Sequence, residues 1–412
     1  MENEKNTKEL STFDRIFEGG KPNMSVYGII SEFNPFHSGH KHLFERARAS
    51  GADAIVCVMS GNSVQRGEIA LTGKYKRAEM ALTQGADLVL ELPYPYSSAS
   101  AEHFAAAGVS IASEFADTLF FGSECGDADL LREAARICMS EEFVEEYKNT
   151  LASGTGTASA YFDLLERKTG CKYLSNDILG IEYIKAALKL NLNVAFATTP
   201  RVGGAYASTE IEDGAIQSAS AIRELVARGD IEKASDYMPK ECFEILRTAI
   251  LEGNTTDTAK LGAPIKLFFR MSAPEDICNF AECDMGIASR ICTAAKECAD
   301  DDIMVHLRTK RYTDARLRRA MLFALTGVLR DDVKAAPQYT NLLAANARGR
   351  ELLAKKRKRG GLTVLAKAAD VPNTPEAKRQ AELSARLDSV FALALEKEIS
   401  ATDMLRISPI IH

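Results

Sequence analysis

Two histidines three residues apart stand at the start of an expected helix, in surroundings that suit phosphate binding. His37 and His40 follow an apolar, strand-like stretch over residues 26–30 and an Asn-Pro turn, and a helical pattern continues over residues 41–49. The free N–H groups and the dipole at a helix start favour a bound phosphate. Gly39 lacks the Cβ that would hold phosphates away from the backbone.

Both imidazoles can donate hydrogen bonds to the same phosphate oxygens, because positions three apart share one face of a helix. Stabilising the charge on a transferring phosphoryl group is the main task of such a site. Two histidines at a helix start are, taken alone, more often capping or packing residues. The full order of strand, Asn-Pro turn, His-x-Gly-His and helix favours nucleotide chemistry, with His37 and His40 as the catalytic residues.

Polar residues also mark two other expected helix starts. Ser218, Ser220 and Arg223 either cap one helix, with Glu224 as a capping-box partner, or hold the outer phosphates of a nucleotide, and both roles are compatible. Asn176 begins another helix, as an ordinary N-cap or as a nucleotide ligand.

Charged segments near the histidines are ambiguous. Residues 65–68 and 74–77 follow the second expected strand and are either solvated charge or contacts to a substrate or an RNA. Glu32 and Asn34 could orient an imidazole or a bound metal ion.

Strands and helices alternate around these residues. Near-continuous apolar strands are expected at residues 26–30, 54–59, 88–92, 118–121 and 194–198, with helices at 41–49, 75–84, 101–114, 129–139 and 177–190. This alternation predicts a doubly wound, Rossmann-like parallel α/β sheet covered on both faces. Ligands of such sheets bind beyond the carboxyl ends of the strands, where residues 28–40, 60–62, 122–124 and 199–201 lie.

The strand signals fade after about Asp230, and amphipathic helices are expected at residues 241–252, 288–299, 313–329 and 376–397, the last with Thr374 as N-cap. We predict a flexible extension over residues 1–24, a nucleotide-binding α/β domain over 25–230 and a mostly helical domain over 231–412. The Gly-Thr-Gly-Thr segment at 154–157 follows a helix rather than a strand, so it is expected to be a loop and N-cap rather than a dinucleotide loop.

The composition is that of a globular protein without a membrane segment. Of 412 residues 46% are hydrophobic and 26% are charged, and no apolar run approaches the roughly 20 residues of a membrane helix. The first 22 residues have no apolar signal core. Nine cysteines without a Cys-x-x-Cys pair predict reduced thiols in a cytoplasmic protein, and Cys278, Cys283, Cys292 and Cys298 have no zinc-site spacing.

The net charge of −6 conceals a basic segment. Residues 306–360 contain 15 Lys or Arg and four Asp or Glu, a local charge of +11, which leaves −17 for the rest of the chain. Such a run is often a solvated face, but two basic clusters on an acidic protein favour a polyanionic partner such as nucleic acid.

Ordered motifs along most of the chain resemble a known family. From about Tyr27 onward the chain is similar to the HIGH-type nucleotidyltransferases and, within them, to the bacterial tRNA(Met) cytidine acetate ligases. The matching blocks are residues 28–40, 58–61, 65–68, 86–94, 120–124, 176–180, 218–223 and 309–313. Phe33, Ser38 and Asn62 stand where tyrosine, asparagine and histidine are frequent in that family.

The resemblance implies an ATP-dependent ligase that acetylates N4 of the wobble cytidine of elongator tRNA(Met) through an acetyl-adenylate. Residues 25–230 would be the ATP-binding nucleotidyltransferase domain and 231–412 the tRNA-binding domain, with acetate as co-substrate, Mg²⁺ at the phosphates, and neither membrane nor DNA as a partner. The ATP site would comprise Ile30, Ser31, Glu32, Phe33, Asn34, Pro35, Phe36, His37, Ser38, Gly39, His40, Lys41, His42 and Leu43, then Gly122, Asn176, Arg201 and Val202.

Two other functions fit part of the pattern. One is a nucleotidyltransferase that acts on a small metabolite in cofactor synthesis, which would leave the basic region without a purpose. The other is an RNA-binding module that only senses ATP, against which the intact His37, His40 and Arg223 argue.

Overall fold

In the computed structural model, five parallel strands form the centre of a mixed sheet. They are β1 (Val26–Ser31), β2 (Ala54–Ser60), β3 (Leu88–Leu92), β4 (Thr118–Ser123) and β5 (Ala195–Pro200). The order across the sheet is β5-β4-β1-β2-β3-β6-β7, with β8 paired to β6. The structure describes residues 24–152, 157–200, 218–299, 302–309 and 311–412. The expected extension over residues 1–24 therefore lies outside the described residues except for Met24.

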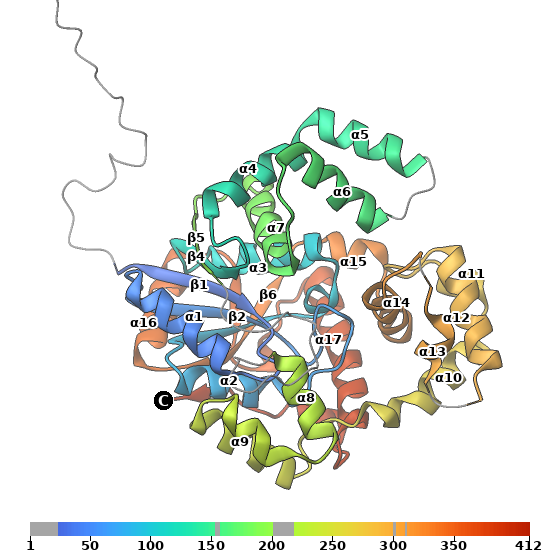
Figure 1. Cartoon of the computed structure of the whole chain (residues 1–412). Coiled ribbons are helices and arrows are strands. Elements are labelled where there is room, and N and C mark those ends of the chain that lie inside the picture. Colours follow the sequence, from blue (N-terminus) through green and yellow to red (C-terminus); the bar gives the residue numbers. More distant parts are fainter. Residues whose placement is uncertain (1–23, 153–156, 201–217, 300–301, 310) are drawn as a thin grey trace, which may run out of the picture.

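Helices cover both faces of this sheet, because successive strand residues point to opposite sides. In β2, Ala54, Val56 and Val58 belong to the core under α3 (Ala101–Ala112), α4 (Ala128–Met139) and α7 (Ser175–Lys189). The intervening Ile55, Cys57 and Met59 belong to the core under α1 (Ser38–Ala49), α2 (Lys74–Thr83), α8 (Ala219–Ala227) and α9 (Lys240–Leu251). The predicted doubly wound α/β fold is confirmed (Figure 1).

The remaining helices lie at the periphery and in the second half of the chain. They are α5 (Glu141–Ala152), α6 (Thr157–Thr169), α10 (Gly262–Met271), α11 (Pro274–Ile277), α12 (Met285–Glu297), α13 (Ile303–Leu307), α14 (Asp314–Thr326), α15 (Arg330–Lys334), α16 (Ala347–Arg359), α17 (Pro375–Ala394) and α18 (Ala401–Met404). Short 3₁₀ helices are η1 (Tyr96–Ser98), η2 (Ile231–Asp236), η3 (Thr258–Leu261) and η4 (Ala368–Asp370). Figure 1 shows α10 to α13 gathered in a lobe beside α14.

All the expected strands and helices occur, with ends within three residues of the predicted ones, and Thr374 caps α17 as expected. The start of α6 at Thr157 agrees with a helix after the 154–157 segment, of which 154–156 lie outside the described residues.

The expectation that strands end near Asp230 was wrong. β6 (Tyr339–Ala345) pairs antiparallel with β3, and β7 (Thr363–Leu365) and β8 (Ile410–Ile411) pair with β6. β6 is buried along most of its length, so its Leu- and Ala-rich sequence shows no polar alternation that would identify a strand. The second half of the chain thus contributes three strands to the sheet of the first.

The state of the cysteines agrees with the prediction of reduced thiols. All nine cysteines are free thiols, and Cys283, Cys292 and Cys298 are buried whereas Cys278 is partly exposed. Within the described ranges, no helix has the length and apolarity needed to cross a membrane.

Candidate functional site

A cavity lies at the carboxyl ends of β1, β4 and β5, between the first turns of α1, α7 and α8. The sheet order reverses between β1 and β4, and such a switch point is where doubly wound sheets bind ligands. The expected site residues that line it are Ile30, Ser31, Glu32, Phe33, Asn34, His37, Gly39, His40, His42, Leu43, Gly122, Asn176, Ser218 and Arg223.

Four expected residues do not line this cavity. Phe36 is buried in the core beneath α1, and Pro35 precedes it in the turn. Ser38 donates a hydrogen bond from Oγ to the carbonyl oxygen of Tyr237 at 2.9 Å, and Lys41 is exposed. Arg201 and Val202 lie outside the described residues.

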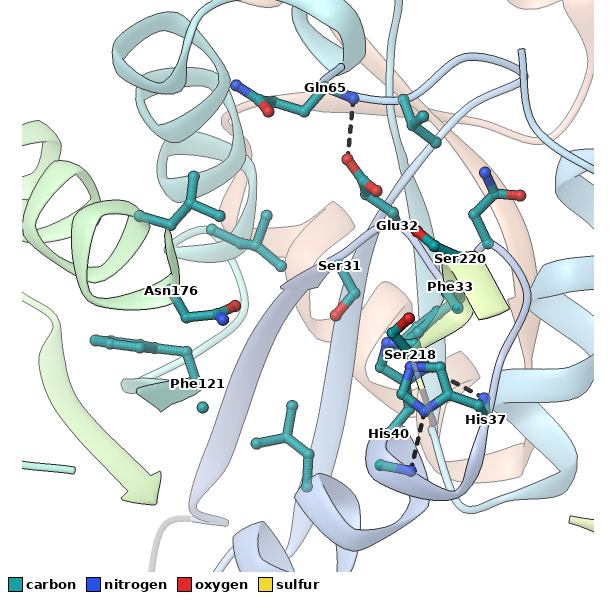
Figure 2. A pocket seen from close by; sticks show the side chains of 18 of the residues that line it. Ser31, Glu32, Phe33, His37, His40, Gln65, Phe121, Asn176, Ser218 and Ser220 are labelled. Atoms are coloured by element: carbon teal, nitrogen blue, oxygen red, sulfur yellow. Dashed lines mark hydrogen bonds between the residues drawn. The ribbon is translucent and has the colours of Figure 1, made fainter. Parts of the chain in front are cut away.

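The two histidines build the N-terminal cap of α1. His37 is the N-cap, and its Nδ1 accepts a hydrogen bond from the N–H of Gly39 at 3.0 Å. The Nδ1 of His40 accepts from the N–H of His37 at 3.2 Å, and the ring centroids are 3.8 Å apart (Figure 2). Because each Nδ1 accepts, each neutral ring carries its proton on Nε2, where it is a donor. The capping role, which the sequence set beside phosphate binding, therefore uses Nδ1 of each ring and is compatible with a phosphate contact through Nε2.

Aromatic packing holds the imidazoles in place. The rings of Phe33 and Phe36 lie 4.9 Å and 5.3 Å from the ring of His40, centroid to centroid. Phe44 packs behind both phenylalanines, and all three are buried. The helix start is thus rigidly supported from the core side.

A buried arginine ties together the ends of β1 and β2. The guanidinium of Arg77 donates to the carbonyl oxygens of Glu32 at 2.7 Å, Ser60 at 3.1 Å and Thr72 at 3.0 Å. Burial lowers the pKa of Arg77 to about 10, so the side chain remains charged at neutral pH. Arg77 is neither solvated charge nor a lining residue of the cavity; it positions the backbone that carries Glu32.

Its neighbour Lys74 is also buried. The Nζ of Lys74 lies 2.9 Å and 3.0 Å from the carboxylate oxygens of Glu91. Asn62 donates from Nδ2 to Asp388 of α17 at 2.8 Å and accepts the N–H of Lys74 at 3.0 Å. Asn62 is thus engaged in joining α17 to the sheet and does not line the cavity.

The start of α8 brings a cation to the cavity. Ser218 caps the helix by accepting the N–H of Ala221 at 3.3 Å, whereas Glu224 accepts from Arg228 and is no capping-box partner. Arg223 donates to the carbonyl oxygen of Asn34 at 2.9 Å and the Oγ of Ser220 at 3.2 Å, and it pairs with Glu68 at 3.3 Å.

Two polar side chains follow the end of β1, and Glu32 is partly buried whereas Asn34 is buried. Glu32 accepts the N–H of Gln65 at 2.9 Å, and burial raises the pKa of its carboxyl. Asn34 accepts the N–H of Leu71 at 2.8 Å, and among the described residues its Nδ2 has no hydrogen-bond partner. That amide is therefore a donor available to a ligand of the cavity.

The side of the cavity away from the histidines is largely apolar. Phe121 and Tyr183 contact each other edge to face, with centroids 5.6 Å apart, and Leu179 lines the same side. A Cβ on Gly180 would lie 2.4 Å from the ring of Phe121, so glycine allows α7 to approach β4 this closely. Asn176 lies in the first turn of α7, but the N-cap is Leu174, so the interpretation of Asn176 as an N-cap was wrong.

The lining also includes residues for which the sequence left a ligand contact open, namely Gln65, Arg66, Glu68, Thr199, Pro200 and Ser220. The lining residues that were not predicted are Val64, Phe104, Phe121, Leu179, Tyr183 and Ala219. Phe121 could have been found from the rule that ligands contact strand ends, as Thr199 and Pro200 were, since it lies near the end of β4. Phe104 and Tyr183 come from the interior of helices and carry no such local signal.

Comparison with known proteins assigns the chain to a family. Residues 24–404 match the family described as HIGH Nucleotidyl Transferase. The chain belongs to this family. It is 35% identical to the tRNA(Met) cytidine acetate ligase of Acetivibrio thermocellus, over 92% of this chain and 94% of that one, and 33% identical to that of Listeria monocytogenes, over 94% and 100%.

Solved structures agree with this membership. The crystal structure of apo TmcAL from Thermotoga maritima superimposes with a TM-score of 0.88 at 30% identity, covering 94% of this chain and 99% of that one. The same protein bound with alpha-thio ATP gives a TM-score of 0.86 with the same coverage. The resemblance inferred from the sequence motifs is confirmed.

Proposed function

We propose that this chain is an ATP-dependent ligase that acetylates N4 of the wobble cytidine of elongator tRNA(Met). The full-length similarity to tRNA(Met) cytidine acetate ligases supports the substrates. The observation that carries the chemistry is the histidine cap of α1, because it places two imidazoles, each with Nε2–H as a donor, side by side at a helix N-terminus that suits a phosphate.

In the first proposed step an acetate oxygen attacks the α-phosphorus of ATP. The new P–O bond replaces the bond to pyrophosphate, which leaves, and acetyl-adenylate remains. His37, His40 and the N–H groups of α1 stabilise the negative charge on the phosphoryl oxygens as it builds. Ser218, Ser220 and Arg223 at the start of α8 hold the departing phosphates.

In the second step the cytidine N4 amine attacks the acyl carbon, AMP leaves, and the amine loses a proton. The amine lone pair is delocalised into the ring, so the acyl group must be activated first. The apolar side of the cavity, with Phe121 and Leu179, would hold the adenine of ATP and of the intermediate.

Mg²⁺ is part of the proposal and would neutralise phosphate charge when bound. Mg²⁺ in phosphoryl-transfer sites takes most of its ligands from phosphates and water and needs only one or two carboxylates. Glu32 and Glu68 are the carboxylates that line the cavity, so the donor set fits an ion that arrives with ATP.

We also propose that residues 231–412 form the tRNA-binding region, in a cytoplasmic protein. The exposed Arg350, Lys355, Arg357 and Lys358 of α16 form no ion pair with an acidic side chain among the described residues, which suits a phosphodiester backbone. Lys356 is excluded from this role, because it is buried and pairs with Glu114 at 2.5 Å.

Incorporation of radiolabelled acetate into bulk tRNA, with ATP and Mg²⁺, tests the proposal against a His40→Ala variant. Label that requires ATP and disappears in the variant is the expected result. Acetate-dependent pyrophosphate release without labelled tRNA would point to another acceptor, such as a small metabolite. If neither signal occurs, the proposed ligase activity is wrong.

A further inference from the structure

A carboxylate occupies the N-terminus of α7, next to the cavity. Glu124 follows β4, and its Oε2 accepts the N–H groups of Asn176 at 3.1 Å and Asp177 at 3.0 Å. A negative charge is stabilised at this position by the helix dipole and by the free N–H groups of the first turn. Glu124 is therefore held in place by the helix itself, whether or not a ligand is present.

The second oxygen of Glu124 determines how the amide of Asn176 is turned. Its Oε1 lies 2.6 Å from Nδ2 of Asn176. An ionised carboxylate can only accept hydrogen bonds, so the nitrogen of the amide must face Glu124. The carbonyl oxygen Oδ1 then points to the other side, and Asn176 lines the cavity. No hydrogen bond to Oδ1 is found among the described residues. Asn176 therefore presents a hydrogen-bond acceptor, Oδ1, to the cavity rather than a donor.

Asn176 lies on the side of the cavity that suits a nucleobase. Figure 2 shows Asn176 and Phe121 across the cavity from His37 and His40. In the proposed ATP complex the phosphates bind near the histidines. The planar base then packs against Phe121, Leu179 and the backbone of Gly122, which has no side chain. An acceptor at the base end favours a base with an amino group on its edge. Hypoxanthine has a carbonyl oxygen where adenine has its 6-amino group, and two acceptors would then face each other.

We propose that Glu124 is the residue that makes this site select adenine, because it orients the Asn176 amide with its oxygen toward the 6-amino group. Glu124 acts through Asn176 and is a positioning residue. The inference rests on the proposed function, since it concerns the base of the ATP bound in this cavity.

Titration calorimetry of the intact chain with ATP, inosine triphosphate and 2′-deoxy-ATP tests the proposal without depending on turnover. For the parent protein we expect ATP to bind at least about tenfold more tightly than inosine triphosphate, since a mismatch leaves polar groups unpaired. Glu124→Gln keeps the size of the side chain, but glutamine can donate as well as accept, so the Asn176 amide can turn over. The expected result is weaker ATP binding and a preference close to one.

The matched control is Glu102→Gln. Glu102 also contacts α7, through Lys189 at 2.7 Å, but near the other end of the helix and outside the cavity lining. We expect this variant to keep the parent preference. Asn176→Ala is the second test: it should weaken ATP about tenfold and leave inosine triphosphate unchanged, so the test survives if Glu124→Gln does not fold.

Equal binding of ATP and inosine triphosphate by the parent protein would overturn the inference and leave the proposed function intact. Loss of 2′-deoxy-ATP binding together with equal binding of the two bases would place Asn176 at the ribose, which also overturns it. No ATP binding at all would instead contradict the proposed function.

Discussion

This chain has two basic clusters, one on α14 with Arg316, Arg318 and Arg319 and one on α16 within residues 348–359. They lie at opposite edges of the same sheet. Arg318 of α14 pairs with Glu68 at 3.3 Å, and Glu68 lines the cavity at the carboxyl edge. A Cβ on Gly67 would lie 2.6 Å from the backbone nitrogen of Arg319, so α14 is packed directly on the 64–68 loop. The α14 cluster is therefore adjacent to the proposed ATP site.

The α16 cluster lies at the amino edge. Asn346, the N-cap of α16, donates to the carboxylate of Asp87 at 2.9 Å, and Asp87 directly precedes β3. At the other end of the helix, Lys356 pairs with Glu114, which lies shortly before β4. Because the strands are parallel, these acids all lie at the edge remote from the cavity.

The two clusters also differ in how their charge is used. Arg316, Arg318 and Arg319 of α14 are each paired with an acidic side chain. In α16 the exposed Lys355, Arg357 and Lys358 have no such partner within the described residues, whereas Lys356 does. The two basic segments look similar in the sequence but differ in the structure. The arginines of α14 form ion pairs within the protein near the cavity, whereas the exposed residues of α16 form a surface away from the cavity that suits a polyanion.

The largest effect is expected at the cavity edge of the sheet, when His40 is replaced. In His40→Asn the asparagine oxygen can replace Nδ1 as acceptor for the N–H of His37, but the Nε2–H donor is lost. We expect acetate-dependent ATP–pyrophosphate exchange to fall about 10²- to 10³-fold, as when one donor to a developing oxyanion is removed. His40→Gln, which places its amide near Nε2 instead, should retain more activity. A larger loss in His40→Gln than in His40→Asn would mean that the cap, and not the donor, matters.

The next largest effect is a difference in stability between substitutions of two neighbouring lysines of α16, Lys355 and Lys356. Lys356→Ala breaks a largely buried ion pair and leaves Glu114 partly uncompensated, so we expect the free energy of unfolding to fall by about 2 kcal/mol. Lys355→Ala, at an exposed position, should change it by less than about 0.5 kcal/mol. Urea denaturation measures both. Similar values for the two variants would contradict the assignment of Lys356 to the structure.

A third test concerns the exposed α16 surface alone. Replacing Lys355, Arg357 and Lys358 by alanine should weaken tRNA binding about tenfold and reduce the slope of log affinity against log salt by about two, because phosphate contacts release counterions. Pyrophosphate exchange should not change. The control replaces Arg132, Arg136 and Lys168, which are ion-paired on α4 and α6. An unchanged salt slope in the α16 variant would make this cluster a solvated face.

How far the sequence predicted this structure depends on how local the signal is. β1 to β5 were predictable because apolar runs end at Gly, Pro or polar turns, and the histidine cap because its parts are contiguous. β6 was missed because burial on both faces removes the alternation that identifies a strand. The burial of Arg77 and the contact of Glu124 with Asn176 depend on distant segments, so no local pattern predicts them.

The smallest expected effect links α14 to the cavity. Glu68 lies between Arg318 and Arg223, so removing Arg318 leaves Glu68 paired with Arg223 alone and holds that cation more tightly. Arg318→Ala should therefore raise the Kd for ATP by about two- to fivefold, the range of a partly exposed ion pair. Glu68→Gln should have the opposite sign, since it releases Arg223 toward the phosphates. Calorimetry with ATP measures both, and shifts of the same sign would show that Glu68 does not compete with the phosphates for Arg223.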